Sequence, residues 1–242
     1  MRLERITVKS TDGMDVPGYL VEPEKALGGV VVAHGYGACK EEMLGITVKL
    51  AEKGLTALAI DLRGHGEHPA PLDLDVLKDV EGAVAYLRTR FVKVAALGHS
   101  LGGRLALMSS ADLVIGLSPA VAPQITEEGK ELLRLNGTKV RQPHGDFILE
   151  LMGSLGPVPD QPKPKLLLIG ARDVPGIMIG ARQLNGKLSE LRFAEIEEGL
   201  LPEMTPKIKL EYVPRWLNHH ELRYNEPAFT TISGWLLEKL TA

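Results

Sequence analysis

Hydrophobic positions along the chain follow two spacings, one typical of buried strands and one typical of helices. Continuous aliphatic runs predict strands buried on both faces. These runs cover residues 29–33, 55–60, 92–97, 113–117 and 165–169, and the last strand is expected over residues 208–213, which include Lys209 and Glu211. Apolar positions three and four apart, or runs of good helix formers, predict helices between them. The expected helices cover about residues 41–53, 72–87, 104–108, 177–190 and 229–240.

The first residues follow a different pattern. Residues 2–9 and 16–21 alternate apolar and polar side chains, and Thr11-Asp12-Gly13 between them is a turn sequence. Two antiparallel strands joined by a short loop are therefore expected there. The later alternation of strands with helices predicts a doubly wound, mostly parallel α/β sheet with right-handed connections.

Residues 118–164 interrupt this rhythm. They hold prolines at positions 119, 123, 143, 157, 159, 162 and 164, together with short helical and apolar patches. A connection between two core strands is usually only a few residues long. We therefore predict a small lid inserted at 118–164 into one core domain that comprises 1–117 and 165–242. Two roles are open for its apolar side chains, which either contact an apolar part of a ligand or attach the lid to the core: Phe147, Ile148, Leu151 and Met152.

Composition and charge exclude several classes of protein. The net charge of -3 and the lack of a basic run argue against nucleic acid or an anionic membrane surface as a partner. No apolar run is long enough to span a membrane, and the first residues do not read as a signal peptide. The single cysteine, Cys39, excludes an internal disulfide and fits a reducing compartment, so we expect the cytoplasm. Oligomeric state is left open by these features.

The candidate chemistry centres on Gly98-His99-Ser100-Leu101-Gly102-Gly103, which lies between a predicted strand and a predicted helix. A turn this sharp strains its central residue and requires small neighbours. Ser100 is thereby exposed at the sheet edge, and the N–H of Leu101 faces whatever the hydroxyl attacks. The pattern predicts a nucleophile elbow.

A serine hydroxyl needs a base, and the base needs an orienting acid. Asp173 follows the buried strand that ends at Ile169, and His220 follows the last predicted strand. The chain order of Ser100, Asp173 and His220 is the order expected when an elbow serine is served by a later acid and base. The adjacent His219 competes with His220, because neighbouring loop residues point in different directions. A second oxyanion donor is expected at the N–H of Tyr36, in the glycine-containing loop after residue 33.

Five segments together resemble the α/β-hydrolase superfamily. They are His34-Gly35-Tyr36-Gly37, Asp61-Leu62-Arg63-Gly64-His65-Gly66, the elbow, Gly170-Ala171-Arg172-Asp173, and His220-Glu221-Leu222 with Asn225-Glu226-Pro227. Within that superfamily the chain is similar to serine esterases and monoacylglycerol lipase-like enzymes. The resemblance implies Ser100 as nucleophile, Asp173 as acid, His220 rather than His219 as base, and the N–H groups of Tyr36 and Leu101 as oxyanion donors.

These observations predict a serine hydrolase that cleaves a small-molecule carboxylic ester through an acyl-enzyme. No metal or organic cofactor is expected, since the seven histidines and nearby carboxylates show no plausible zinc spacing. Thioester, lactone or amide cleavage would use the same atoms. Two alternatives stay open, a non-catalytic binding protein of the same fold and an acyltransferase with the same three residues.

Overall fold

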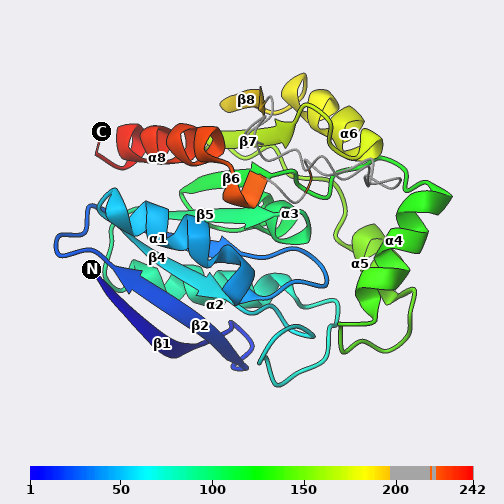
Figure 1. The fold of residues 1–242 in the computed structure, drawn as a ribbon, viewed down its shortest axis with the longest axis horizontal. Coiled ribbons are helices and arrows are strands. Elements are labelled where there is room, and N and C mark those ends of the chain that lie inside the picture. Colours follow the sequence, from blue (N-terminus) through cyan, green and yellow to red (C-terminus); the bar gives the residue numbers. More distant parts are fainter. Residues whose placement is uncertain (197–218, 220–221, 242) are drawn as a thin grey trace, which may run out of the picture.

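A central sheet with helices on both faces forms the molecule (Figure 1). The computed structural model describes residues 1–196, 219 and 222–241. In this part of the chain the sheet has eight strands. They are β1 (Arg2–Lys9), β2 (Asp15–Glu22), β3 (Gly28–Ala33), β4 (Leu55–Ile60), β5 (Val94–His99), β6 (Leu113–Leu117), β7 (Lys165–Gly170) and β8 (Leu191–Ile196).

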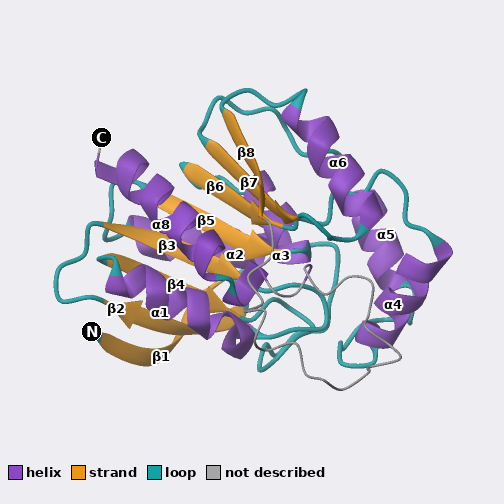
Figure 2. Cartoon of the chain, turned by 45° about the horizontal axis from the view of Figure 1, so that its top comes forward, coloured by secondary structure: helices purple, strands orange, loops and turns teal. Residues whose placement is uncertain are grey.

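Helices follow most of the strands along the chain. The described helices are η1 (Lys40–Met43), α1 (Leu44–Glu52), α2 (Leu77–Arg88), α3 (Leu101–Met108), α4 (Glu127–Gly137), α5 (Phe147–Ser154), α6 (Pro175–Asn185), η3 (Leu222–Tyr224) and α8 (Glu226–Thr241). Both α4 and α5 belong to the stretch between β6 and β7 that the sequence marks as an insertion. They lie beyond the end of the sheet toward which the arrows of the parallel strands point (Figure 2).

The strand order determines where a site can form. Across the sheet the order is β1-β2-β4-β3-β5-β6-β7-β8. Strand β2 pairs antiparallel with β1 and β4, and the strands from β4 to β8 pair in parallel. The chain passes from β3 to β4 on one side and then to β5 on the other. The carboxyl ends of β3 and β5 therefore flank the switch point, where open α/β sheets bind their ligands.

Each face of the sheet is covered by its own set of helices. Because successive side chains of a strand point to opposite faces, β3 contributes to two separate cores. Val30 and Val32 pack with apolar residues of α1 and α8, whereas Val31 and Ala33 pack with those of α2 and α3. Burial on both faces explains why the central strands read as continuous apolar runs. The predicted α/β fold class is confirmed.

The expected elements differ from the observed ones mainly at the carboxyl-terminal side. Strand β8 was not predicted, and the helix expected over about 177–190 is α6, which ends at Asn185. Strand β8 pairs with β7 at the edge of the sheet formed by the described residues, and none of its own residues is fully buried. An edge strand of this kind leaves only a weak apolar pattern in the sequence. The strand expected at 208–213 lies outside the described residues.

The helix expected from residue 72 begins five residues later, at Leu77. Leu72 is buried, but its N–H donates to the carbonyl oxygen of Arg141 at 2.7 Å, so it belongs to a loop held against the insertion. Leu72 has the spacing of a helix residue, but it lies in a loop and packs into the core from there.

The helices of the described ranges include none that is both long and apolar enough to cross a membrane. The expected cytoplasmic location stays a prediction.

Candidate active site

Ser100 occupies the turn between β5 and α3, where the sequence predicts a strand, a sharp turn and a helix. Its backbone has φ 51° and ψ -114°, a conformation that costs a non-glycine residue about 1–3 kcal/mol. Two hydrogen bonds of 2.9 Å hold it there, from its own N–H to the oxygen of Leu117 and from the N–H of Ala120 to its oxygen. The neighbouring strand thus fixes the strained turn, and Ser100 lines a cavity.

Two glycines beside Ser100 are required by close backbone contacts. A Cβ at Gly98 would lie 2.1 Å from the carbonyl oxygen of Gly102, and a Cβ at Gly102 would lie 2.4 Å from that of His34. Both distances are far inside van der Waals contact. The N–H of Gly102 also donates to the His34 oxygen at 3.1 Å, which joins the elbow to the loop after β3.

Asp173 and His219 form a buried pair at the end of β7. Nδ1 of His219 lies 2.9 Å from Oδ1 of Asp173. The Asp173 carboxylate also accepts hydrogen bonds from the N–H of Val174 at 2.7 Å and from the Ser118 hydroxyl. Burial opposes ionisation of this carboxyl, but its hydrogen bonds with His219 and Ser118 outweigh burial and place its pKa below the ordinary value. An ionised Asp173 can therefore hold the His219 ring in one tautomer.

The preferred base of the sequence prediction, His220, lies outside the described residues. The structure instead brings the alternative, His219, against Asp173, with only 7% of its surface exposed. The path of the loop determines which of the two adjacent histidines faces the carboxylate. The sequence has no apolar pattern from which that path could be predicted. Among the described residues it is His219 that contacts Asp173, and this contact enters the proposal below.

His99 supports the backbone of His219 from below the elbow. Its Nε2 lies 2.6 Å from the carbonyl oxygen of His219, and the two ring centroids are 4.7 Å apart. His99 is itself buried next to Ser100. The residue before Ser100 thus positions the backbone of the histidine that pairs with Asp173.

Ser118 is a site residue that the sequence did not indicate. It follows β6, is fully buried and has φ 41°, in the left-handed region that disfavours residues with a Cβ. Its N–H donates to the oxygen of Leu168 at 2.7 Å, and its hydroxyl donates to Oδ2 of Asp173. A strained, buried serine that bonds to the acid is a positioning residue. A hydroxyl directly after a predicted core strand was the only available signal.

Two residues that line the cavity beside Ser100 have backbone N–H groups without an acceptor among the described residues. Tyr36 and Leu101 both line it. Within the described ranges, neither the N–H of Tyr36 nor that of Leu101 donates to another group of the protein. Leu101 is the first residue of α3, where N–H groups lack a partner inside the helix. Both donors are therefore free to bind an oxygen of a ligand.

The loop after β3 is fixed by buried neutral imidazoles. Nδ1 of His34 lies 2.7 Å from the oxygen of Gly35, and the N–H of Leu62 donates to its Nε2 at 3.1 Å. Burial lowers the pKa of His34 to about 4 and that of His65 to about 3. Both rings are neutral near pH 7, and His34 connects the loop of Tyr36 to the loop after β4.

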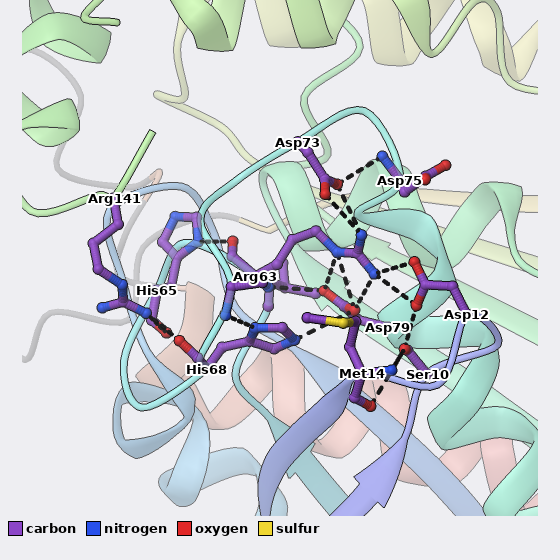
Figure 3. A network of polar contacts seen from close by, with 12 residues as sticks. Ser10, Asp12, Met14, Arg63, His65, His68, Asp73, Asp75, Asp79 and Arg141 are labelled. Atoms are coloured by element: carbon purple, nitrogen blue, oxygen red, sulfur yellow. Dashed lines mark hydrogen bonds and ion pairs between the residues drawn. The ribbon is translucent and has the colours of Figure 1, made fainter. Parts of the chain in front are cut away.

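Buried charges hold the loop after β4 (Figure 3). The guanidinium of Arg63 reaches three carboxylates: it lies 2.8 Å from those of Asp79 and Asp73 and 3.2 Å from that of Asp12. Asp79 is fully buried on α2. Arg141 of the insertion donates from its backbone N–H to the oxygen of Gly64 at 2.9 Å. This cluster, which we call the Arg63 network, fixes a loop that supports both His34 and the insertion.

The cavity above Ser100 has a volume of about 570 Å³. Ser100 and His219 lie in its wall, and much of the remaining wall comes from apolar side chains of the insertion. Of the four apolar residues singled out from the sequence, Ile148 and Met152 line the cavity, whereas Phe147 and Leu151 pack into the core without lining it. The insertion thus lines the cavity and also packs against the core, while contact of its apolar side chains with a ligand stays a prediction. Its action as a lid stays a prediction.

Groups of three or more histidine, cysteine, aspartate or glutamate side chains placed to hold a metal ion do not occur in residues 1–196, 219 and 222–241.

The chain belongs to the alpha/beta hydrolase family, whose sequence profile matches residues 30–236. This agrees with the resemblance carried by the motifs around Tyr36, Ser100 and Asp173. One curated relative, the uncharacterized protein YfhR of Salmonella typhi, is 29% identical over 114 residues. That match covers 43% of this chain and 39% of YfhR, so it spans about two fifths of the relative's length.

The fold is that of several esterases of known structure. The esterase EaEST from Exiguobacterium antarcticum superposes with a TM-score of 0.68 at 15% identity, over 99% of this chain and 100% of that one. Est1E from Butyrivibrio proteoclasticus, in a structure with bound ferulic acid, gives a TM-score of 0.69 at 18% identity, over 98% and 100% of the two chains. At such identities the likeness concerns the fold.

Proposed function

We propose that this protein is a serine hydrolase that cleaves carboxylic esters. Ser100 is the nucleophile, His219 the general base and Asp173 the acid that orients it. The N–H groups of Tyr36 and Leu101 form the oxyanion hole. The observation that carries the proposal is one cavity lined both by Ser100 on its strained turn and by a histidine bonded to a buried carboxylate.

The proposed reaction has two halves. In the first, the Ser100 hydroxyl attacks the ester carbonyl while His219 takes its proton, and the tetrahedral intermediate collapses as the C–O bond to the alcohol breaks. The alcohol leaves with the proton held by His219, and the acyl group stays on Ser100. In the second half, His219 takes a proton from water, which attacks the acyl-enzyme. The carboxylic acid leaves, and the proton returns to Ser100.

The oxyanion hole contributes most when the carbonyl oxygen becomes charged. Removing one donor of this kind costs about 3 kcal/mol of transition-state stabilisation in well-studied serine hydrolases. Here both proposed donors are backbone groups on rigid turns beside a cavity with a largely apolar wall. An apolar wall lowers the effective dielectric constant and so strengthens such hydrogen bonds. The names of the structural relatives, several of them esterases, support carboxylic esters as the substrate class.

The proposal is tested with a fluorophosphonate probe and p-nitrophenyl esters of increasing acyl length. We expect the probe to label the wild-type protein and not Ser100→Ala, and we expect turnover of the esters to be lost in that variant. Added alcohols should divert only a minor part of the acyl group, since an acyltransferase would form the new ester even in excess water. A folded wild-type protein that neither reacts with the probe nor hydrolyses any ester or thioester would overturn the proposal in favour of ligand binding without turnover.

Loss of the Ser118 hydroxyl is expected to lower kcat/KM for ester hydrolysis about tenfold, because Asp173 loses a hydrogen bond that keeps it ionised and aligned. Ser118→Ala and Ser118→Gly remove the same hydroxyl, but only glycine relaxes the φ of 41°. Both variants should therefore lose activity equally, while Ser118→Gly should melt at a higher temperature than Ser118→Ala. The pH profile of kcat/KM and thermal unfolding measure the two effects. Wild-type activity in both variants would show that ester hydrolysis does not need the Ser118 hydroxyl.

A further inference from the structure

Arg104 lies one helical turn after Ser100 on α3. Its backbone N–H donates to the Ser100 oxygen at 3.0 Å, and the residue is only 9% exposed. Nevertheless, Arg104 lines the cavity in which Ser100 lies. A buried cation thus stands in the wall of the proposed substrate cavity.

The guanidinium of Arg104 is bound only by backbone oxygens. Nη1 donates to the oxygen of Ala120 at 3.3 Å, and Nη2 donates to that of Gly156. Nε is buried and has no hydrogen-bond partner. No aspartate or glutamate of the described residues lies within ion-pair distance, and only two of the five N–H donors of the group are occupied.

Arg104 differs in this from the other buried cations of the described chain. Each of the others has at least one carboxylate within 4 Å. Their partners are Asp61 for Lys40, Asp79 for Arg63, Asp160 for Lys165 and Glu42 for Arg223. A buried charge without a counter-ion is unfavourable, and burial accordingly lowers the pKa of the Arg104 guanidinium.

The charges around the cavity also favour an anion. Apart from Arg104, the ionic side chains among its described lining residues are Lys139, Glu42 and Arg223. Glu42 accepts a hydrogen bond from Arg223 at 2.7 Å, so these two charges offset each other. Lys139 is exposed and pairs with no carboxylate of the described residues. The described side chains that line the cavity therefore carry more positive than negative charge, which favours anionic ligands.

We propose that Arg104 binds a carboxylate of the substrate, so that the ester cleaved at Ser100 carries a free acid group. This inference rests on the proposed function. A single buried guanidinium in a mostly apolar wall matches one negative charge, as on a half-ester of a dicarboxylic acid, better than a doubly charged phosphate. The planar guanidinium pairs with a carboxylate through parallel N–H donors.

The test compares esters that differ only in this acid group. Monoethyl adipate and ethyl hexanoate have acyl chains of the same length, and chromatography measures their hydrolysis. We expect the wild-type protein to prefer the adipate ester by tenfold or more in kcat/KM. Arg104→Gln should lower the ratio of the two values about tenfold to hundredfold, since it removes a charge-assisted hydrogen bond. Arg104→Lys should restore part of it, and Lys187→Gln, which removes an exposed charge outside the cavity, should leave it unchanged.

Binding provides a readout that does not depend on turnover. Monoethyl adipate should bind to Ser100→Ala more tightly than ethyl hexanoate does, and the further change Arg104→Gln should abolish the difference. If Arg104→Gln slows both esters equally and monoethyl adipate binds no better than ethyl hexanoate, Arg104 only connects the loops of Ala120 and Gly156 and the inference is wrong. In that case ester hydrolysis and probe labelling persist, so the proposed function stands. Failure of the proposed function would instead remove hydrolysis of every ester while Arg104-dependent binding of monoethyl adipate remained.

Discussion

His219→Ala is expected to lower kcat/KM for ester hydrolysis by about 10⁴- to 10⁶-fold, whereas His220→Ala should change it by less than about threefold. The two variants are expected to differ because the His219 ring contacts the proposed acid: its Nδ1 lies 2.9 Å from Oδ1 of Asp173. Only a base held in this way can take the Ser100 proton and return it to the leaving alcohol. Steady-state hydrolysis of a p-nitrophenyl ester measures both variants over the required range.

Two controls accompany this comparison. The rate of fluorophosphonate labelling should fall in His219→Ala and not in His220→Ala, because activation of Ser100 precedes any release of product. Thermal unfolding establishes that both variants are folded. A fall of activity in His220→Ala with an active His219→Ala would reverse the assignment and restore the base that the motif His220-Glu221-Leu222 suggests.

Local steric rules made the sharp turn at Ser100 predictable. Gly98 and Gly102 admit no Cβ, so the spacing of glycines around Ser100 encodes the turn itself. Asp173 was predictable for a related reason, since it follows a buried strand whose apolar run is unmistakable. The loop of Tyr36 also follows such a run. In each case the residue is placed by the end of a central strand, and central strands have the strongest sequence pattern.

The features that escaped prediction depend on contacts distant in sequence. Strand β8 is half-exposed at the sheet edge, so its side chains alternate weakly. The hydroxyl of Ser118, which follows β6, donates to Asp173, which follows the neighbouring strand β7. The residues around Ser118 in the sequence give no sign of this contact. Arg104 was visible as a charge in an apolar helix, but only the structure shows that no carboxylate of the described residues lies within ion-pair distance of it. Chain order restricted the base to two adjacent histidines, and the fold of the loop distinguishes them.

Arg63→Met is expected to lower the free energy of unfolding by about 3–5 kcal/mol, the usual effect of removing one partner from a buried ion pair. Asp79 is fully buried, and Arg63 binds it through the backbone N–H at 2.8 Å and through the guanidinium at 2.8 Å. Without that guanidinium the Asp79 carboxylate stays buried with its main counter-charge removed. Urea unfolding followed by circular dichroism measures the loss.

The matched control for this prediction is an arginine of the surface. Arg182 lies 2.8 Å from Glu195, but their side chains are 54% and 31% exposed, so Arg182→Met should cost less than about 1 kcal/mol. The double variant Arg63→Met, Asp79→Leu should regain part of the lost stability, because it removes the isolated charge as well. Equal effects of Arg63→Met and Arg182→Met would mean that the Arg63 network stabilises the loop after β4 by packing alone. A large effect specific to Arg63 would instead link the buried charges to the loop that holds His34 and, through His34, to the proposed oxyanion donor, the N–H of Tyr36.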